Sequence, residues 1–519
     1  MWKRLFAVRP KSRSTAGLHA LLLLTLFFTG CATVPHDLPK TSSEFMTDTG
    51  NTHFGRLAAD WADNHEERSG FQPIFQGMDA LGARLRILEK AEKSVDLQYF
   101  LMKDDSAGKV MLYALLQAAD RGVRIRFLLD DVFTTAPDRN LLLLNQHPNA
   151  EIRLFNPISR SGIRALNFVG NFRQANRRMH NKSFTVDNAV SIVGGRNIAD
   201  EYFQLKETSV FADFDVLAFG PVVSEISASF DDYWNHALAV PIELLSTDLE
   251  AGALDAARDR IDANTGVLYS GTYKRALESS LLQDVMSGKQ ALFVADARVM
   301  ADSPEKLVNA VSIEHKKLVG ELRELVISAK QEVVIISPYY VPGKSGVEFA
   351  REIVDEGVRL IVVTNSLASN NHVPVHSAYA RYRKDVLGVG VELYEARADA
   401  GRFAATPGGP ENFTLHTKLI LIDRRYLFVG SLNMDPRSVD INAEMGLLID
   451  SPEMTGAMAD IIDARLTDIA YEVVLNDKGK LEWHGQTDGA EVVETKEPQT
   501  SGWLRFKAWF MKIAPESQM

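Results

Sequence analysis

Two stretches of the chain carry the same succession of helical and strand-like hydrophobic patterns. In the first stretch, residues 79–129, the apolar residues Leu81, Leu85 and Leu88 recur at the spacing of one helix face. The strand-like segment SVDLQYF follows, then a second helical pattern, then Gly122 and the apolar run VRIRFLL. This order predicts a helix, a strand, a helix and a second strand.

The same order returns in residues 319–363. A helical pattern precedes the strand-like segment EVVIISPYY, and a second one precedes Gly357 and the run VRLIVV. Aligning Gly122 with Gly357 gives an offset of 235 residues. Two tandem copies of one unit are the simplest explanation of this repetition.

Strands that alternate with helices of this length imply crossover connections and a sheet covered by helices. We therefore predict an α/β fold with two tandem lobes, one at residues 76–240 and one at 316–475. The intervening residues 241–315 are rich in Ala, Asp and Ser and lack a long apolar run. We expect them to form a helical connector.

The first thirty residues are basic, then apolar from Ala20 to Phe28, then small, which is typical of a secretory signal peptide at residues 1–30. Cys31, the chain's single cysteine, follows where bacterial lipoproteins are lipidated. We expect a lipid anchor at Cys31, a polar tether over residues 31–75 and a place in the bacterial cell envelope facing the periplasm. Ala32 favours the outer membrane, the inner membrane remains an alternative, and an uncleaved anchor is the competing interpretation.

Composition and charge narrow the candidate functions. With 46% hydrophobic and 24% charged residues, the chain is typical of a globular protein with sizeable cores. Its net charge is -11, and residues 31–519, without the five cations of the leader, carry -16. Such a chain repels polyanions, so nucleic acid is disfavoured as a partner. One cysteine excludes an internal disulfide.

The C-terminal tail, residues 476–519, is first polar and then amphipathic. Its segment WLRFKAWFMKIAP places Trp503, Phe506 and Phe510 on one helix face, with cations elsewhere. A short helix lying in a membrane interface and a helix packed back on a lobe are both consistent with this pattern.

Each lobe carries one copy of a polar motif. The first is HNKSFTVD at residues 180–187, followed six residues later by Gly194, Gly195, Arg196 and Asn197. The second is HTKLILID at residues 416–423, followed six residues later by Gly430, Ser431, Leu432 and Asn433. The histidines are 236 residues apart, which nearly matches the offset of the lobes. A second copy with the same downstream tail is rare by chance.

Strand geometry suggests how each motif is used. Residues i and i+2 of a strand share a face, so His180 would project with Lys182, and His416 with Lys418. The motifs' last residues, Asp187 and Asp423, are expected at the turn into the next strand, where they would hold the motif's shape. The small residues Gly194, Gly195, Gly430 and Ser431 permit close backbone approach to an anion, and Asn197 and Asn433 would add amide donors.

These residue types suit displacement at a phosphodiester. That reaction needs a nucleophile, an acid for the leaving oxygen, and cations that oppose charge on the other phosphate oxygens. A pair of histidines with a pair of lysines supplies all three.

The duplicated His-x-Lys-x4-Asp motif with its Gly-Ser/Gly-x-Asn tail resembles that of the phospholipase D superfamily, and the resemblance covers roughly residues 79–470. It implies two α/β lobes related by a pseudo-twofold axis, with the active site at their interface and with no metal or cofactor. It also implies a phosphohistidine intermediate, with His180 as nucleophile and His416 as acid and base. The near symmetry of the motifs leaves that order open.

Each histidine also needs a carboxylate on its other ring nitrogen, which fixes the tautomer and supports the imidazolium. Glu444 has the position that the family gives to this acid after the second motif. For the first motif the counterpart is Asp215, with Asp213 as the competitor.

Among these enzymes, the chain looks like the bacterial cardiolipin synthases, especially the exported, lipoprotein-like C-type branch. This implies phospholipid substrates and transfer of a phosphatidyl group, from phosphatidylglycerol or phosphatidylethanolamine, to the glycerol hydroxyl of phosphatidylglycerol. A phospholipase D or phosphodiesterase would use the same residues on water, and a non-catalytic lipid-binding lipoprotein is disfavoured by the intact motifs. We expect a membrane-bound monomer, and an accessory protein remains a candidate partner.

Overall fold

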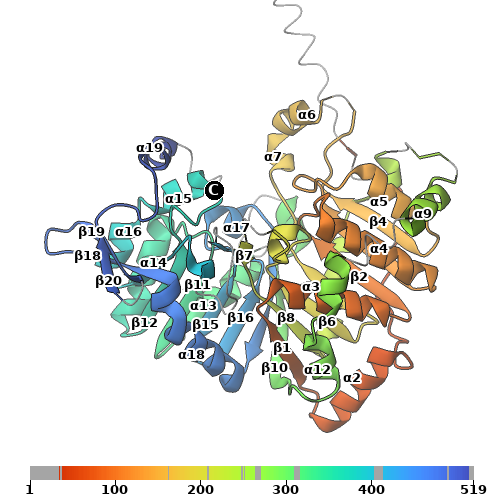
Figure 1. Ribbon diagram of the computed structural model, residues 1–519, viewed down its shortest axis with the longest axis horizontal. Coiled ribbons are helices and arrows are strands. Elements are labelled where there is room, and N and C mark those ends of the chain that lie inside the picture. The colour runs from red at the N-terminus through yellow and green to blue at the C-terminus, as the bar shows by residue number, and fades with distance from the viewer. Residues whose placement is uncertain are drawn as a thin grey trace, which may run out of the picture.

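The computed structural model describes residues 34–35, 38–161, 163–206, 210–246, 249–250, 252–263, 271–308, 316–402, 413–487 and 490–513. Two lobes stand next to each other, the N-terminal one in red to yellow and the C-terminal one in green to blue (Figure 1). The predicted signal peptide and Cys31 lie outside the described residues.

The first lobe is built on a mixed sheet. Its three central strands β2, β3 and β4 are parallel, and every other pairing is antiparallel. In spatial order the strands are β9 (Ala239–Pro241), β4 (Ala150–Phe155), β3 (Arg124–Asp130), β2 (Ser94–Tyr99), β5 (Ser183–Val186), β6 (Val190–Gly194), β8 (Asp215–Phe219) and β1 (Ser69–Ile74).

The second lobe repeats this plan and extends it at its outer edge. The parallel strands are now β11, β12 and β13. In spatial order the strands are β10 (Phe293–Ala301), β17 (Met445–Asp450), β16 (Tyr426–Gly430), β15 (Leu419–Ile422), β11 (Glu332–Ile336), β12 (Arg359–Asn365), β13 (Glu392–Ala396), β18 (Ala470–Leu475), β19 (Leu481–Thr487) and β20 (Ala490–Glu494).

Helices cover both sheets. Those before the second lobe are α2 (His53–Asn64), α3 (Gly77–Glu89), α4 (Ser106–Asp120), α5 (Asp138–Asn145), α6 (Arg164–Gly170), α7 (Phe172–Ala175), α8 (Val222–Asn235), α9 (Ala253–Ala263), α11 (Thr272–Leu277) and α12 (Leu281–Met286). Those of the second lobe and tail are α13 (Lys317–Ile327), α14 (Gly343–Asp355), α15 (Val373–Tyr379), α16 (Arg383–Gly388), α17 (Pro436–Asp440), α18 (Pro452–Ile469) and α19 (Gly502–Met511). Short 3-10 turns occur at Asp200–Tyr202, Ile242–Leu244, Pro304–Leu307 and Ala400–Arg402.

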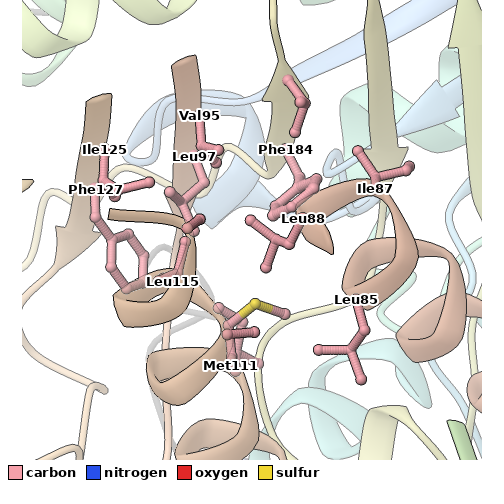
Figure 2. Packing of buried hydrophobic residues seen from close by; sticks show 14 of the residues in the cluster. Leu85, Ile87, Leu88, Val95, Leu97, Met111, Leu115, Ile125, Phe127 and Phe184 are labelled. Carbon is pink, nitrogen blue, oxygen red and sulfur yellow. The ribbon is translucent and has the colours of Figure 1, made fainter. Parts of the chain in front are cut away.

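The predicted repeat is confirmed in both lobes. In the first, the helix, strand, helix and strand are α3, β2, α4 and β3, and in the second they are α13, β11, α14 and β12. The aligned residues Gly122 and Gly357 have φ of 95° and 83°, so both end a helix in the left-handed conformation that glycine adopts most easily. Side chains of α3 and α4 pack on β2, β3 and β5 to form the core of the first lobe (Figure 2).

The two sheets are continuous, because β1 pairs with β10 in antiparallel fashion. β1 lies next to β8 and β10 lies next to β17, so the pseudo-twofold axis passes between β1 and β10. A shared apolar core also joins the lobes and contains Phe71, Val193, Leu419 and Met445. The predicted α/β fold with two related lobes is therefore confirmed.

Two predictions about the connecting segments are wrong. The connector at residues 241–315 is not purely helical, because Phe293–Ala301 form the strand β10 that joins the sheets. The tether does not extend to residue 75, because β1 is fully buried and Phe54 of α2 packs into the first core. Each of these strands is paired on both sides at the lobe junction, β1 with β8 and β10, and β10 with β1 and β17.

Along the described part of the chain, no helix combines the length and the hydrophobicity needed to cross a bilayer. Helix α19 packs against α15, but Trp503, Phe506, Trp509 and Phe510 of α19 remain exposed. The tail therefore rests on the second lobe and still presents an aromatic face to solvent.

Candidate active site

The two predicted motifs meet between the lobes. The strands β5 and β15 begin at Ser183 and Leu419, so each motif's histidine and lysine lie just before the strand. The sequence pattern had predicted that they lie within it. The backbone there is held by the opposite lobe instead. The amide of His180 donates to the carbonyl of Ala443 (2.8 Å), and that of His416 donates to the carbonyl of Ala212 (2.7 Å).

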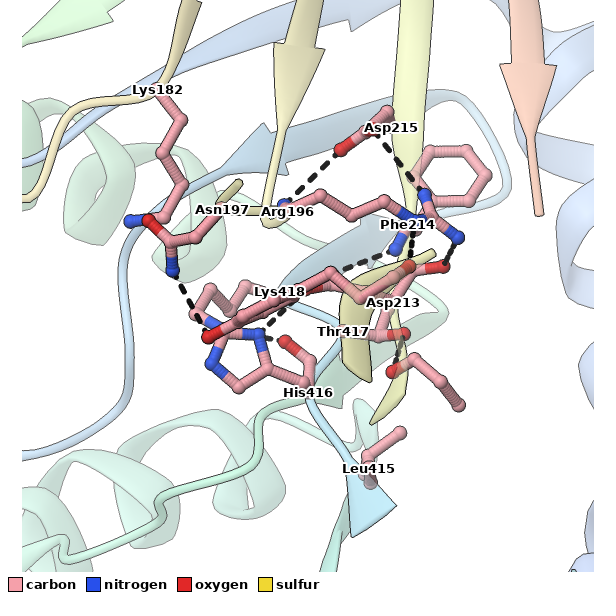
Figure 3. A network of polar contacts seen from close by, with 12 residues as sticks. Lys182, Arg196, Asn197, Asp213, Phe214, Asp215, Leu415, His416, Thr417 and Lys418 are labelled. Atoms are coloured by element: carbon pink, nitrogen blue, oxygen red, sulfur yellow. Dashed lines mark hydrogen bonds and ion pairs between the residues drawn. The ribbon is translucent and has the colours of Figure 1, made fainter. Parts of the chain in front are cut away.

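The acid that follows each of these carbonyls binds the imidazole. His180 Nδ1 lies 2.7 Å from Glu444 Oε2. His416 Nδ1 lies 2.6 Å from Asp213 Oδ2, as Figure 3 shows. Each histidine is therefore oriented by a carboxylate of the other lobe. A carboxylate on Nδ1 fixes the proton there and leaves Nε2 as the reactive nitrogen. Nε2 of His416 lies 3.4 Å from Lys418 Nζ.

The prediction that Asp215 is the acid of the first motif is wrong. Asp215 is fully buried and forms ion pairs with Arg84 (2.9 Å) and Arg196 (3.4 Å). Sheet register explains the difference, because Gly194 pairs with Asp215 just as Gly430 pairs with Gly446. The structural counterpart of Glu444 is therefore Asp213.

Glycine is required in the motif tails by these same acids. A Cβ on Gly195 would lie 2.1 Å from Asp213 Oδ1, and one on Gly194 would lie 2.3 Å from Asp215 Oδ1. The backbone of Gly194 and Gly195 thus lies close to the segment that carries Asp213 and Asp215. The sequence had predicted a close approach of this backbone to a bound anion. Ser431, the counterpart of Gly195, donates its hydroxyl hydrogen to Glu444 Oε2 (2.5 Å) and so helps to orient that acid.

The two lysines are buried within the site. Lys182 Nζ donates to the carbonyl of His180 (2.6 Å), and Lys418 Nζ donates to that of His416. Burial lowers the pKa of Lys182 to about 7 and that of Lys418 to about 8. A phosphate bound here would restore both charges by pairing with them.

The histidines share one electrostatic environment. Burial, together with the charges of both lysines, lowers the pKa of His180 well below its usual range and that of His416 to about 3. Because each histidine responds to the lysine of the other motif, the two motifs form a single site.

The two acids differ in their ionisation. Burial raises the pKa of Glu444 to about 7 despite the nearby Lys182. Burial would also raise the pKa of Asp213, but the charges of His416 and Lys418 outweigh it and lower that pKa. Asp213 is therefore the more readily ionised partner.

The two asparagines lie at the site with different partners. Asn197 Nδ2 donates to the hydroxyl of Tyr202 (3.0 Å), and its Oδ1 accepts from the amide of Leu101. Asn433 is 6% exposed, and its Oδ1 accepts no hydrogen bond from any residue with described coordinates. This unsatisfied oxygen can accept a hydrogen bond from a ligand, whereas a contact with a phosphate oxygen would use Nδ2.

The motifs' last residues shape the backbone away from the site. Asp187 and Asp423 have φ of 52° and 51°, at the turns between β5 and β6 and between β15 and β16. Their carboxylates accept backbone amides from the segment before β2 (residues 92–94) and before β11 (residues 330–332). Asp187 and Asp423 therefore fix the positions at which β2 and β11 begin.

Aromatic side chains from outside the two motifs pack against the histidines. The ring of Phe100 meets His180 edge-on at 4.7 Å, and that of Phe211 stacks on His416 at 5.3 Å with 7° between the planes. Tyr202 meets His416 edge-on at 5.0 Å. Phe100 follows β2 and could have been suspected from its place at the end of a central strand, whereas Phe211 and Tyr202 carry no such signal.

A buried ion pair holds the backbone of Glu444 in place. Lys306 Nζ lies 2.7 Å from Asp302 Oδ2, and this oxygen accepts from the amide of Glu444 (3.2 Å). Both residues belong to the segment predicted as a connector, which therefore contributes to the site. Among the described residues, no three or more His, Cys, Asp or Glu side chains are grouped to hold a metal ion.

Comparisons with known proteins agree with this geometry. The family model described as cardiolipin synthase, PLD-like domain, matches residues 85–234 and 322–466. The chain is 38% identical to cardiolipin synthase C of Escherichia coli over 465 residues, covering 87% of this chain and 96% of that protein. It is 31% identical to an uncharacterized protein of Helicobacter pylori over 516 residues, covering 96% and 99%.

The fold also resembles a solved structure. The phosphatidylserine synthase of Haemophilus influenzae superposes with a TM-score of 0.52 at 13% sequence identity, covering 80% of this chain and 90% of that one. At this identity the likeness concerns the fold alone.

Proposed function

The chain belongs to the PLD-like family of cardiolipin synthases, and from this membership we propose that it is a phosphatidyltransferase that makes cardiolipin. Its substrates are phospholipids: phosphatidylglycerol as the acceptor, and phosphatidylglycerol or phosphatidylethanolamine as the donor. The observation that carries the proposal is the crossed pairing of His180 with Glu444 and His416 with Asp213, which builds one two-histidine site from both lobes.

The first step forms a covalent intermediate. His180 Nε2 attacks the phosphorus of the donor while the bond from phosphorus to the headgroup oxygen breaks. The negative charge of the bound donor phosphate offsets the charges of Lys182 and Lys418, so His416 takes up a proton at Nε2 when the donor binds. It then donates this proton to the departing oxygen, and glycerol or ethanolamine leaves with its hydroxyl group restored. Lys182 and Lys418 oppose the charge on the remaining phosphate oxygens, and the Nδ2 group of Asn433 donates a hydrogen bond to one of them.

The second step transfers the phosphatidyl group. His416, now neutral, takes the proton of the glycerol hydroxyl of phosphatidylglycerol, and the resulting oxygen attacks phosphorus. The bond between phosphorus and His180 breaks, which yields cardiolipin and restores both histidines. Glu444 stabilises the positive charge that the imidazole of His180 carries as the phosphohistidine forms and breaks.

The ionisation of the two acids supports this order of roles. An ionised carboxylate stabilises an imidazolium, and Asp213 is the more readily ionised acid. His416 is therefore the better proton carrier. His180, which is paired with Glu444, is then the nucleophile.

We place the enzyme in the bacterial envelope, anchored through Cys31 and facing the periplasm. This proposal rests on the leader pattern alone. Phospholipid substrates are consistent with a membrane location.

Lipid analysis tests the proposed reaction. Membrane-reconstituted enzyme, H180A and H416A are each incubated with phosphatidylglycerol, with and without phosphatidylethanolamine, and the products are identified by mass spectrometry. We expect cardiolipin from the unmodified enzyme and none from either variant. Phosphatidic acid as the sole product would make the protein a hydrolase and would contradict the proposal. Dependence on phosphatidylethanolamine identifies the donor.

A further inference from the structure

One exposed apolar patch lies on the first lobe, just ahead of the first motif. Ile163, Leu166, Val169 and Phe172 are exposed by 63%, 50%, 69% and 44% along α6 and into α7. The opposite side of α6 is fixed to the lobe, because Asn167 is buried and donates to the carbonyls of Ser159 and Ser161. The helix is therefore held with its apolar face outward.

A second patch lies on the other lobe, on α19. Trp503, Phe506, Trp509, Phe510 and Ile513 are exposed by 72%, 50%, 64%, 54% and 80%. This helix is fixed too: Ser501 caps its N-terminus, and Ala508 is buried where α19 meets α15. Large exposed aromatic side chains on an ordered helix indicate a surface that is covered in use.

Both patches are basic in a chain that is acidic overall. Residues 152–186 and 498–515 contain no Asp or Glu, although the whole chain has 68 of them. Arg173, Lys507 and Lys512 are exposed beside the apolar residues. Exposed Trp and Phe interleaved with Lys and Arg are the composition of segments that lie at the surface of an anionic bilayer.

The helices that carry the two patches lie at one edge of the molecule, and neighbouring segments link each of them to the region of the active site. Figure 1 shows α6 and α19 projecting at the upper edge of the two lobes. Helix α7 ends five residues before His180, and the adjacent Asn176 accepts a hydrogen bond from Arg437 of the second lobe (2.6 Å). On the other side, α15 contacts α19, and His372 at the start of α15 packs on Tyr339 (5.6 Å).

We propose that α6 with α7 and α19 form a two-point docking surface for a phospholipid bilayer that contains anionic lipid. Two separate patches on one edge match an extended flat surface better than a compact protein partner, and their cations match its charge. Docked in this way, the edge of the molecule at which α6 and α19 project faces the lipids. The inference goes beyond the proposed reaction, since docking does not require turnover.

Depth-sensitive quenching on the full chain tests this surface. The variants V169C and F506C each add one cysteine that carries an environment-sensitive fluorophore. The matched control is I461C, because Ile461 is 44% exposed and lies on α18, at the lower edge of Figure 1. The unmodified chain, treated identically, corrects for any labelling of Cys31. All carry H180A, so binding is measured without turnover, in phosphatidylethanolamine–phosphatidylglycerol vesicles containing acyl-nitroxide lipid.

We expect quenching at positions 169 and 506 to exceed that at 461 by at least about twofold, because interfacial helices bury their apolar face near the acyl boundary. The excess should shrink when phosphatidylglycerol is omitted or salt is raised. Equal quenching at all three positions would overturn the proposal and favour a protein partner for these patches. Excess quenching at only one patch would overturn the two-point geometry. Neither result depends on whether the enzyme makes cardiolipin.

Discussion

Two aspartates two residues apart have separate tasks in this protein. Asp213 orients a histidine across the lobe interface, while Asp215 neutralises two buried arginines. The sequence alone favoured Asp215, because the segment after Asn197 is longer than its counterpart after Asn433 and hides the correspondence. Only the register of β6 on β8 identifies Asp213. The histidines, lysines and asparagines were found in advance because their spacing is repeated.

The first prediction separates these two roles. D213N should lower the rate of cardiolipin formation by about 10²–10⁴-fold with little change in the unfolding temperature, because the amide can no longer support an imidazolium at His416. Rate and thermal unfolding are measured on the same preparations.

D215N is the matched control. It leaves Arg84 with a weakened partner, so it should lower the free energy of unfolding by about 3 kcal/mol. A large rate loss in D215N with unchanged stability would contradict this assignment of roles.

The second prediction concerns acid stability. His416 has a folded pKa of about 3 and an unfolded pKa near 6.5, so the unfolded chain binds more protons between these values. Its contribution to stability is therefore lost as pH falls below about 6.5. The free energy of unfolding should drop by about 2 kcal/mol between pH 7 and 5 from this residue alone.

The H416Q variant removes this component. Its unfolding temperature should fall less than that of the unmodified protein over the same pH range, when both are followed by circular dichroism. H484Q, on β19 of the second lobe, should follow the unmodified protein. Parallel pH profiles for H416Q and the unmodified protein would show that His416 is not buried in its neutral form.

At the scale of elements, the hydrophobic patterns predicted the repeated helices and strands well but missed β1 and β10. The central strands are apolar and are buried by helices, so their patterns are continuous. β10 reads FVADARVMA, in which only Ala295 and Met300 are buried, and it is a strand because β1 and β17 flank it. Such a strand is determined by its neighbours, and local sequence carries little trace of it.

The third prediction tests how a motif's last residue sets the position of its strand. D423A removes an acceptor for three backbone amides before β11 and places a residue other than Asp, Asn or Gly at positive φ. We expect the free energy of unfolding to fall by about 2 kcal/mol, with the Michaelis constant for lipid nearly unchanged.

D423N serves as the comparison. Its side-chain oxygen still accepts amides, and Asn tolerates the left-handed conformation, so it should retain most of the stability. If D423N lost activity while keeping its stability, the carboxylate would have a direct role in the reaction.

At the scale of the whole molecule, the two lobes are one folding and catalytic unit. The strands β1 and β10 make one continuous sheet, the lobes share an apolar core, and each histidine is held by an acid of the other lobe. The sequence predicted the meeting of the motifs through family resemblance. The sequence did not predict that each histidine pairs with an acid of the other lobe, because this pairing depends on the path of the chain after β6 and β16.

This connection predicts the outcome of mixing inactive variants. H180A lacks the histidine of the first motif and keeps the second motif complete. H416A lacks the histidine of the second motif and keeps the first motif complete. If both lobes of a site come from one chain, as β1 and β10 require, mixed vesicles of the two variants should form no more cardiolipin than either variant alone. Recovery of up to about a quarter of normal activity would instead mean that lobes exchange between chains, as in domain swapping. Co-refolding the two variants before reconstitution is the stricter test, because it gives exchange every opportunity, and the continuous sheet predicts that activity stays absent even then.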